Sequence, residues 1–325
     1  MMAAACSEPA CRPGEVRIGM TCHAQQNLVD GSADMPRGAA RLDAAAPATE
    51  DASLPRDGAF PRPADAASSQ EPSPTGDPDA ILDELPLGPP SFQFRADAVT
   101  LSGTRVTSLP NRRGSDALVV SPSVLVAPVS DAAFAGAPSL VFSGTEWLDS
   151  NLPPSSWTFL HDGSGAEVFV VYRPGNGDGQ TLVGTARQQD TISTCGASTF
   201  IDEASDTTQV LVANGGNPRP VDIAPPLALA AGVATYTSWQ LGGPGIVHAV
   251  FDRDRSVSAL TALAAKPCTT PPAYTLRLGA NAGTHDRGFR GAIAELLIFE
   301  RALREEERRQ VRAYIAARYG IAPER

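Results

Sequence analysis

The sequence GFRGAIAELLIFERALREEERRQVRAYIAARYGI, residues 288–321, decides the fold. Its first half contains an apolar run of strand length, 291–300, which ends at a charged turn. Its second half, 304–319, has the spacing of an amphipathic helix, because the apolar residues Val311, Tyr314, Ile315 and Tyr319 fall on one stripe. A terminal helix this short persists only when it packs on other structure, so we predict that it docks on the preceding strand.

The charges and the glycine at the ends of this helix support its limits. Glu305, Glu306 and Glu307 lie where the helix dipole is positive, and Gly320 stands where helices commonly end in a left-handed residue. Glu305 and Arg309 are four residues apart, so we predict an ion pair between them on the solvated face.

The chain from residue 91 onward has the pattern of short strands separated by turns rich in Gly, Pro, Asn and Asp. Many short, evenly spaced strands favour a sandwich or barrel, and the 29 Gly and 29 Pro disfavour a helical bundle. The predicted fold class is all-β, a two-sheet antiparallel sandwich with one C-terminal helix. The predicted strands are Ala98–Leu101, Arg105–Leu109, Ala117–Ser121, Ser139–Phe142, Glu167–Arg173, Thr181–Thr185, Thr208–Ala213, Ala234–Gln240, Ile246–Asp252, Ser256–Leu263, Tyr274–Gly279 and Gly291–Glu300.

Several motifs together resemble one known family. They are Gly291, Ile293-Ala294-Glu295, Phe299-Glu300-Arg301-Ala302-Leu303, Tyr314-Ile315 and Tyr319-Gly320-Ile321, with PSLVFSGTEWLDS (138–150) and FLHDGSGAEVFVVYRP (159–174) upstream. This set resembles the LamG-type domains of the concanavalin A-like lectin/glucanase superfamily, which occur in bacterial secreted and surface proteins. The resemblance implies a jelly-roll sandwich but no single activity. One departure is Arg304, where the family has a Ser or Thr N-cap, and its absence costs about 1 kcal/mol.

The first 90 residues differ from the rest in charge and composition. They carry 14 Asp plus Glu against 6 Arg, so they hold −8 of the net charge of −10. Residues 31–90 are rich in Ala, Pro, Asp and Ser without a strand or helix period, so they cannot bury enough surface to offset the entropy of ordering. We predict a small N-terminal piece at 1–30, a disordered acidic spacer at 31–90 and the jelly-roll domain at 91–325.

Four of the five cysteines can be paired by their positions. Cys11 and Cys22 bracket a glycine-containing segment that can fold back as a ribbon, and a disulfide there would staple a piece too small for a core. Cys195 and Cys268 are the candidates for a second disulfide, inside the large domain. The alternative is a cytosolic chain with free thiols.

The fifth cysteine bears on the cellular location of the protein. Cys6 follows three alanines, which resembles the end of a bacterial lipoprotein signal, and lipidation of Cys6 would require a start upstream of Met1. We therefore predict an exported protein, either a cell-surface or outer-membrane lipoprotein or a secreted one. No run of about 18 apolar residues occurs, so the lipid anchor is the only membrane contact predicted.

Several function classes lack their sequence signals. The acidic balance disfavours nucleic-acid binding. There is no zinc-ligand spacing, nucleophile elbow or phosphate-binding loop. A retaining glycosidase needs two carboxyl groups about 5–5.5 Å apart, but Glu295 and Glu300 are five residues apart on a strand and so face opposite ways, with Leu297 where the family's glucanases have Asp. We predict no catalytic residue, and a glycoside hydrolase is the weakest alternative.

Binding is the class of function that remains. Lectin-like sandwiches commonly hold ligands, and sometimes calcium, in loops at one end, because carboxylates and carbonyls there converge on a hard cation. The candidate calcium ligands are Asn281 and Asp286, followed by Asp252 and Asp254.

Sugar binding usually adds an aromatic platform. Trp147, Trp157 and Trp239 are the candidates, with His285 as a further ligand contact, although a large ring on a sheet belongs more often to the core. We predict a non-catalytic carbohydrate-binding or adhesion module whose partners are glycans or surface proteins. The alternative is a structural or protein-interaction module that binds no sugar.

Overall fold

In the computed structural model, the apolar run near the C-terminus forms β19 (Arg290–Phe299), and both layers of the core depend on it. Leu296 and Ile298 face one layer, while Leu297 and Phe299 face the other, and all four side chains are buried. A strand covered on both faces carries apolar residues at nearly every position, which explains the unbroken run.

The structure describes residues 15–18, 21–24, 77–120, 125, 127–177, 179–187, 195–201, 208–214, 220–221, 232–242, 245–252, 256–262, 268–284 and 286–321. For 15–18, 21–24, 120, 213–214, 220–221, 238–242, 245–252 and 256–262, only the backbone is described. No helix in these residues is both long and apolar enough to cross a membrane.

The N-terminal unit contains an antiparallel hairpin of β1 (Glu15–Ile18) and β2 (Thr21–Ala24), in which Arg17 lies opposite Cys22. This hairpin overlaps the ribbon predicted between Cys11 and Cys22, and it extends beyond Cys22 to Ala24. Cys6 and Cys11 lie outside the described residues.

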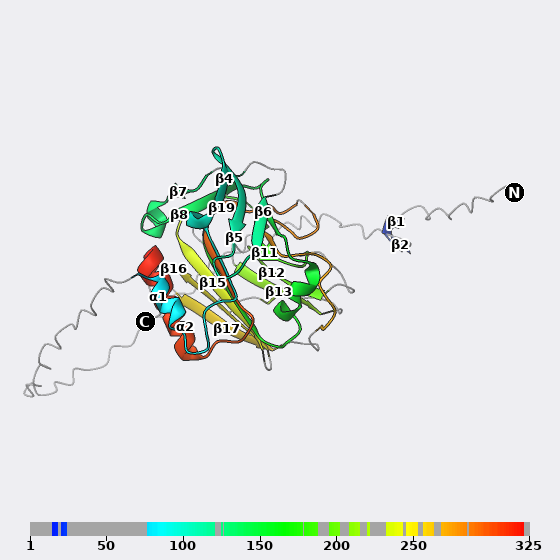
Figure 1. Cartoon of the computed structure of the whole chain (residues 1–325). Helices are drawn as coiled ribbons and strands as arrows, with labels where there is room; N and C mark the ends of the chain where they lie inside the picture. The colour runs from blue at the N-terminus through cyan, green and yellow to red at the C-terminus, as the bar shows by residue number, and fades with distance from the viewer. Residues whose placement is uncertain are drawn as a thin grey trace, which may run out of the picture. The chain divides into compact units, whose positions relative to one another are not determined.

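Residues 77–321 form a sandwich of two antiparallel sheets (Figure 1). Sheet 1 has the order β17 (Ser256–Ala262), β16 (Gly245–Asp252), β15 (Thr235–Gly242), β10 (Ala166–Pro174), β19, β8 (Pro138–Ser143) and β7 (Val129–Ser130), with β3 (Phe92–Arg95) also paired to β19. Sheet 2 has the order β14 (Pro220–Val221), β13 (Thr208–Asn214), β12 (Cys195–Ile201), β11 (Gln180–Gly184), β18 (Arg277–Leu278), β9 (Leu148–Ser150), β6 (Ala117–Val120), β5 (Arg105–Pro110) and β4 (Thr100–Ser102). The predicted all-β two-sheet fold is confirmed.

The first core layer fills the space between the two sheets. Trp157, on the 3-10 helix Pro154–Leu160, lies at its centre with its ring centroid 4.8 Å from that of Phe92. The second layer lies between sheet 1 and α2 (Glu305–Tyr319). The predicted apolar stripe of α2 is buried there: Val311, Tyr314, Ile315 and Tyr319 are each at most 1% exposed.

The ends of α2 differ in one detail from the sequence prediction. Glu305 pairs with Arg308 and Arg312, at 3.1 and 3.2 Å, and no ion pair with Arg309 is found among the described residues. The prediction of a pair with Arg309 was therefore wrong. The helix ends as predicted at Gly320, which has a φ of 64°.

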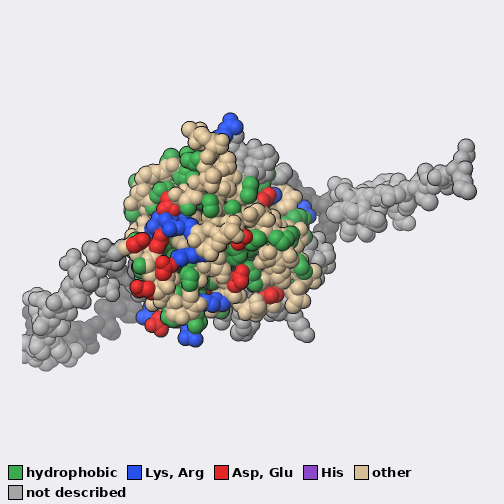
Figure 2. All heavy atoms as spheres, viewed as in Figure 1, with side chains coloured by type: hydrophobic (Ala, Val, Ile, Leu, Met, Phe, Trp, Pro, Cys, Tyr) green, Lys and Arg blue, Asp and Glu red, His purple; other side chains and the backbone are tan. Residues whose placement is uncertain are grey.

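The folded domain begins earlier than residue 91. Leu82 in α1 (Asp79–Asp83) and Leu85 just after it are buried against the second core layer, beside α2. Charged side chains gather on the side where α1 lies (Figure 2). Asp79, at the start of α1, forms ion pairs with Arg95 and Arg112. The prediction that the spacer extends to residue 90 was therefore wrong for this segment, because two leucines anchor it.

Candidate functional site

Three loops meet at one end of the sandwich: 144–147 after β8, 175–177 after β10, and 279–284 with 286–289 before β19. The backbone of Gly288 lies directly against that of Gly144, which joins the first and third loops. The Thr181 N–H donates to the Arg287 carbonyl at 2.8 Å, which ties the third loop to β11. The three loops therefore form one surface, at the end where the sequence predicted ligand binding.

Arg277 on β18 is buried beneath this surface and binds the residues around it. Its Nε and Nη2 donate to the two carboxylate oxygens of Asp149 at 2.6 and 2.9 Å. Its Nη1 donates to the carbonyls of Asn281, at 3.0 Å, and Thr284. The guanidinium carbon lies 5.1 Å from the centre of the Trp147 ring. A planar fork bound on every side fixes the loop that follows β18.

Asn281 completes the same loop and has no exposed surface. Its Oδ1 accepts from Thr181 Oγ1 at 3.0 Å, and its Nδ2 donates to Asp286 at 3.2 Å. Thr284 Oγ1 also donates to Asp286. Burial raises the pKa of Asp286, but these hydrogen bonds outweigh it, so the pKa lies below its ordinary value. Asp286 is thus held as an exposed carboxylate.

The structure brings the first two calcium candidates, Asn281 and Asp286, together as hydrogen-bond partners. In the part of the chain that is described, no three His, Cys, Asp or Glu residues are grouped so that they could hold a metal ion. The Asp252 side chain, Asp254 and His285 lie outside the described residues. The buried amide of Asn281 closes the loop through its hydrogen bonds with Thr181 and Asp286.

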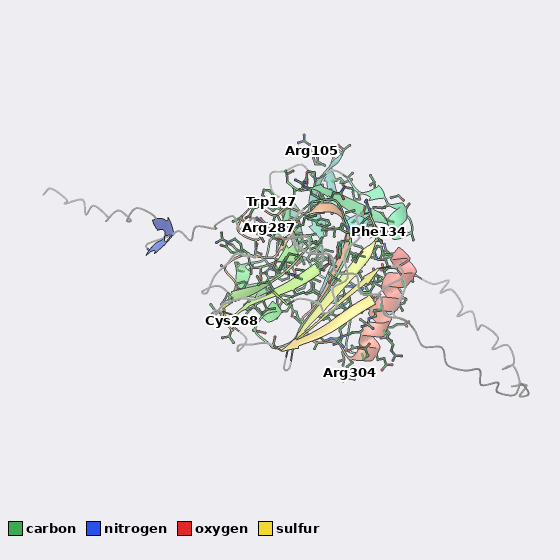
Figure 3. All side chains as sticks on the ribbon, turned by 180° about the vertical axis from the view of Figure 1, so that it is seen from behind. Arg105, Phe134, Trp147, Cys268, Arg287 and Arg304 are labelled. Carbon is green, nitrogen blue, oxygen red and sulfur yellow. A yellow bond between two sulfur atoms is a disulfide. The ribbon has the colours of Figure 1, made fainter. Side chains whose placement is uncertain are left out.

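The three tryptophans predicted as sugar platforms lie in different parts of the domain. Trp147 lies at the loop surface, but only 8% of it is exposed (Figure 3). Trp157 has no exposed surface and belongs to the core, so it cannot be a sugar platform, and that prediction was wrong. The backbone of Trp239 lies in β15, and its side chain is outside the described residues.

An aromatic residue that the sequence reasoning did not select, Tyr274, is half-buried at the same loops. Its ring packs against the backbone of Gly283, and the guanidinium carbon of Arg187 lies 5.5 Å from the ring centre. Asp149 and Arg277 were also missed. The available signal was the alternation of Thr275 and Arg277 with apolar neighbours, which places a charged residue on the outer face of a strand.

The surface continues onto the outer face of sheet 2. Asp149 lies opposite both Arg277 and Val119, so these side chains form a row across β18, β9 and β6. Val119 is 43% exposed. We define the end-loop site as the residues Trp147, Asp149, Tyr274, Arg277, Asn281, Thr284 and Asp286.

Glu295, the residue considered for glycosidase chemistry, lies on the opposite side of the core. It is 1% exposed and accepts hydrogen bonds from Gln93 at 2.8 Å, Tyr314 at 2.9 Å and Tyr319 at 2.8 Å. Burial raises the pKa of Glu295 above its ordinary value, although these donors and Arg95 oppose the shift. Glu295 thereby joins α2 to sheet 1, in agreement with the structural role expected from its place in the strand signature.

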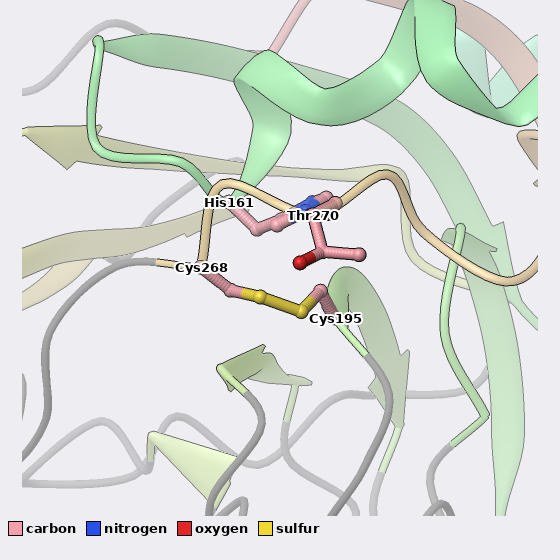
Figure 4. Close-up of a disulfide and its surroundings, with 4 residues drawn as sticks. All are labelled: His161, Cys195, Cys268 and Thr270. Carbon is pink, nitrogen blue, oxygen red and sulfur yellow. A yellow bond between two sulfur atoms is a disulfide. The ribbon is translucent and has the colours of Figure 1, made fainter.

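The predicted disulfide between Cys195 and Cys268 is confirmed, with the Cα atoms 5.9 Å apart (Figure 4). The buried His161 supports the same segment, because its Nε2 lies 2.9 Å from the Thr270 carbonyl. Burial lowers the pKa of His161 and outweighs the effects of Thr270 and Asp162. The disulfide and this contact fix the start of the segment that leads to Tyr274 and β18.

Together these features define a two-sheet antiparallel β-sandwich domain with a polar surface at its end loops. No family model matches the chain, and no curated protein matches it.

Among solved structures, the domain is similar to a mutant GH54 α-L-arabinofuranosidase soaked with 4-nitrophenyl α-L-arabinofuranoside. The TM-score is 0.50 at 12% identity, over 67% of this chain and 52% of that one, so the match spans about half of that enzyme. Domain 4 of the arabinanase AbnA from Geobacillus stearothermophilus, in complex with arabinotriose, gives 0.48 at 14% identity, over 70% and 98%. The CBM40 of Ruminococcus gnavus IT-sialidase, bound to α2,3-sialyllactose, gives 0.38 at 12%, over 62% and 98%. At these identities the likeness shows the fold alone.

Proposed function

We propose that the domain is a non-catalytic carbohydrate-binding module that takes its ligand at the end-loop site. The observation that carries this proposal is the buried Arg277, which holds rigid the loop that presents Thr284 and the exposed Asp286. Sugars are recognised by fixed donors and acceptors beside an apolar surface, and a preformed loop lowers the entropy cost of binding them. Tyr274 and the row through Asp149 extend the same surface.

The burial of two glutamates beneath α2 argues against a catalytic role for them. Glu295 and Glu167 are 1% and 2% exposed, and both lie beneath α2, where each already accepts hydrogen bonds from the protein. A glycosidase acid and nucleophile must both reach a bound sugar. Neither of these buried glutamates is accessible to a bound sugar.

A protein-interaction module is the second candidate function. Leu101 and Val119, on β4 and β6 of sheet 2, are 46% and 43% exposed. Such residues would mark a protein-binding surface if they belonged to one contiguous apolar patch. An array of neutral, uronate-containing and sulfated glycans that gives no signal with the full chain would favour this function over sugar binding.

The test of the end-loop site is a pair of charge-neutralising variants of the full chain. Asp286→Asn is expected to weaken binding to the strongest array ligand about tenfold, because one charge-assisted hydrogen bond is worth about 1.5 kcal/mol or more. Glu306→Gln, an exposed residue of α2 on the other side of the sandwich, is the matched control and is expected to keep the affinity of the wild type. Equal affinities of all three proteins, measured by isothermal titration, would place the ligand elsewhere.

We also infer that the protein is exported and displayed at a bacterial surface as a LamG-like lipoprotein. The Cys195–Cys268 disulfide supports export, since such bonds persist in oxidising compartments. Mass spectrometry of the native N-terminal peptide tests the anchor: a lipidated Cys6 is expected, and an unmodified Met1 would contradict it.

A further inference from the structure

Arg290, the first residue of β19, lies at the same three loops and is held unusually firmly for an exposed residue. Its backbone N–H donates to Gln180 Oε1 at 2.7 Å, and its carbonyl accepts from the Gly175 N–H at 2.7 Å. Gln180 in turn donates from Nε2 to the Gly177 carbonyl at 2.6 Å. The second loop is therefore closed around the backbone of Arg290.

The side chain of Arg290 lies across two glycines, one from each neighbouring loop. A Cβ on Gly144 would stand 2.9 Å from Arg290 Nε, and a Cβ on Gly177 would stand 3.1 Å from its Cδ. Both glycines have positive φ, 101° and 141°, a backbone conformation that other residues rarely adopt. The two loops therefore both pack against the Arg290 side chain and restrict its conformation. We call Gly144 and Gly177 together the glycine bed.

The guanidinium group that this bed holds has no carboxylate partner among the described residues. In contrast, Arg277, Arg301 and Arg308 each form an ion pair at 2.6 to 2.9 Å. Arg287, three residues before Arg290 and on the same loop, also forms no ion pair in the described part of the chain, and it has a positive φ of 53°. Residues with a strained backbone conformation gather at binding sites.

An exposed, fixed guanidinium fork matches the geometry of a carboxylate or a sulfate, each of which offers two oxygens in one plane. We propose that the ligand of the end-loop site is a sugar that carries an anionic group, carboxylate or sulfate, and that Arg290 binds this group, with Arg287 as the second cation. This inference rests on the proposed carbohydrate-binding function. It specifies which class of sugar the site takes.

Two pairs of probes test the proposal, because the members of each pair share one sugar skeleton and only one member carries the anionic group. Trigalacturonate and its trimethyl ester test the carboxylate, and 3′-sulfolactose and lactose test the sulfate. For the full chain, the charged member of at least one pair is expected to bind at least tenfold more tightly than the neutral one by isothermal titration. The pair that shows the difference identifies the anionic group.

Three variants test whether the preference for the charged probe comes from the guanidinium group of Arg290. Arg290→Gln is expected to remove the tenfold preference, and Arg290→Lys to retain part of it, since an ammonium group keeps the charge but loses the bidentate geometry. Arg105→Gln is the matched control, because Arg105 is also an exposed arginine, at the start of β5, and no glycine of the described chain packs against it (Figure 3). Thermal unfolding of each variant checks that the fold is intact.

The results that would overturn this inference differ from those that would overturn the proposed function. Equal binding of charged and neutral members, with a loss on Asp286→Asn, would leave carbohydrate binding standing and remove the anionic ligand. Equal losses in Arg290→Gln and Arg105→Gln would show a general effect of net charge and would remove the role of Arg290. Absence of binding to both pairs removes the anionic ligand, and the glycan array then decides separately whether any sugar binds.

Discussion

Glu167, on β10, offers a stability prediction whose sign follows from its surroundings. The side chain is 2% exposed beneath α2, where it accepts from Arg308 Nε at 2.9 Å and from the Leu303 N–H at 3.1 Å. Burial raises the pKa of Glu167 from 4.5 to about 7, and the opposing effects of Arg308 and Leu303 are smaller than that of burial. The folded protein therefore binds a proton at this site more tightly than the unfolded chain.

The consequence is a contribution to stability that decreases as the pH rises. Below pH 4.5 the carboxyl is protonated in both states, and the contribution is fully present. It is lost between pH 4.5 and about 7, at 1.36 kcal/mol per pH unit. The free energy of unfolding of the wild type, relative to Glu167→Gln, is therefore expected to fall by about 3 kcal/mol from pH 4.5 to pH 8.

Urea unfolding of both proteins, measured at half-unit steps from pH 4.5 to 8, tests this expectation. Glu306→Gln is the control, because Glu306 is exposed on the same helix and its variant should track the wild type at every pH. A difference between wild type and Glu167→Gln that stays constant or grows with pH would refute the reasoning. It would mean that the ion pair with Arg308 outweighs the cost of burying the carboxylate.

Three further changes test other parts of the fold by the free energy of unfolding in urea. Arg304→Ser should add about 1 kcal/mol, because the Glu307 carboxylate already accepts from the N–H of residue 304 and a serine would supply the missing half of the capping box. An unchanged or lower free energy would show that the helix start lacks nothing. Replacing Cys195 and Cys268 together by Ser should cost about 4 kcal/mol, the closure entropy for their separation of 73 residues, and a cost below about 1 kcal/mol would contradict this. Tyr319→Phe should cost about 1.5–3 kcal/mol, since it removes a hydrogen bond of 2.8 Å to the buried Glu295, and a neutral effect would mean that this bond contributes nothing.

The parts of the fold that could be predicted from sequence are those with a local pattern. The period of 3.6 in the last helix fixed its buried stripe, and the apolar run at 291–300 fixed a strand covered on both sides. Most predicted strands lie within two residues of the observed ones, because turn residues bound them. The disulfide was predicted without a local pattern, because Cys195 and Cys268 are the two cysteines of the predicted sandwich domain.

The elements that were missed are short, or they take their stability from distant partners. Strand β3 has only four residues, and it exists because it pairs with β19, some two hundred residues later. Helix α1 follows a proline-rich stretch and has only five residues, and it depends on two leucines packed against α2. An isolated helix of that length does not persist in water, so no local signal could separate it from the spacer.

The candidate site was only half predictable for the same reason. The end loops and Asp286 follow from the turn residues before β19, whereas the pairing of Asp149 with Arg277 joins residues 128 positions apart. Cross-strand register decides which polar residues meet on a sheet face, and a single sequence does not contain that register.

The layer arrangement favours sheet 2 and its end loops as the location of the proposed ligand surface. The outer face of sheet 1 is occupied along β10 and β19 by α1 and α2, which bury Phe169, Leu297 and Phe299. On sheet 2 the strand residues between the core positions include the half-exposed Asp149 and the exposed Val119, without a helix over them in the described chain. The helices thus stabilise one face and leave the other available, so substitutions beneath α2 should change stability while those at the end loops change binding.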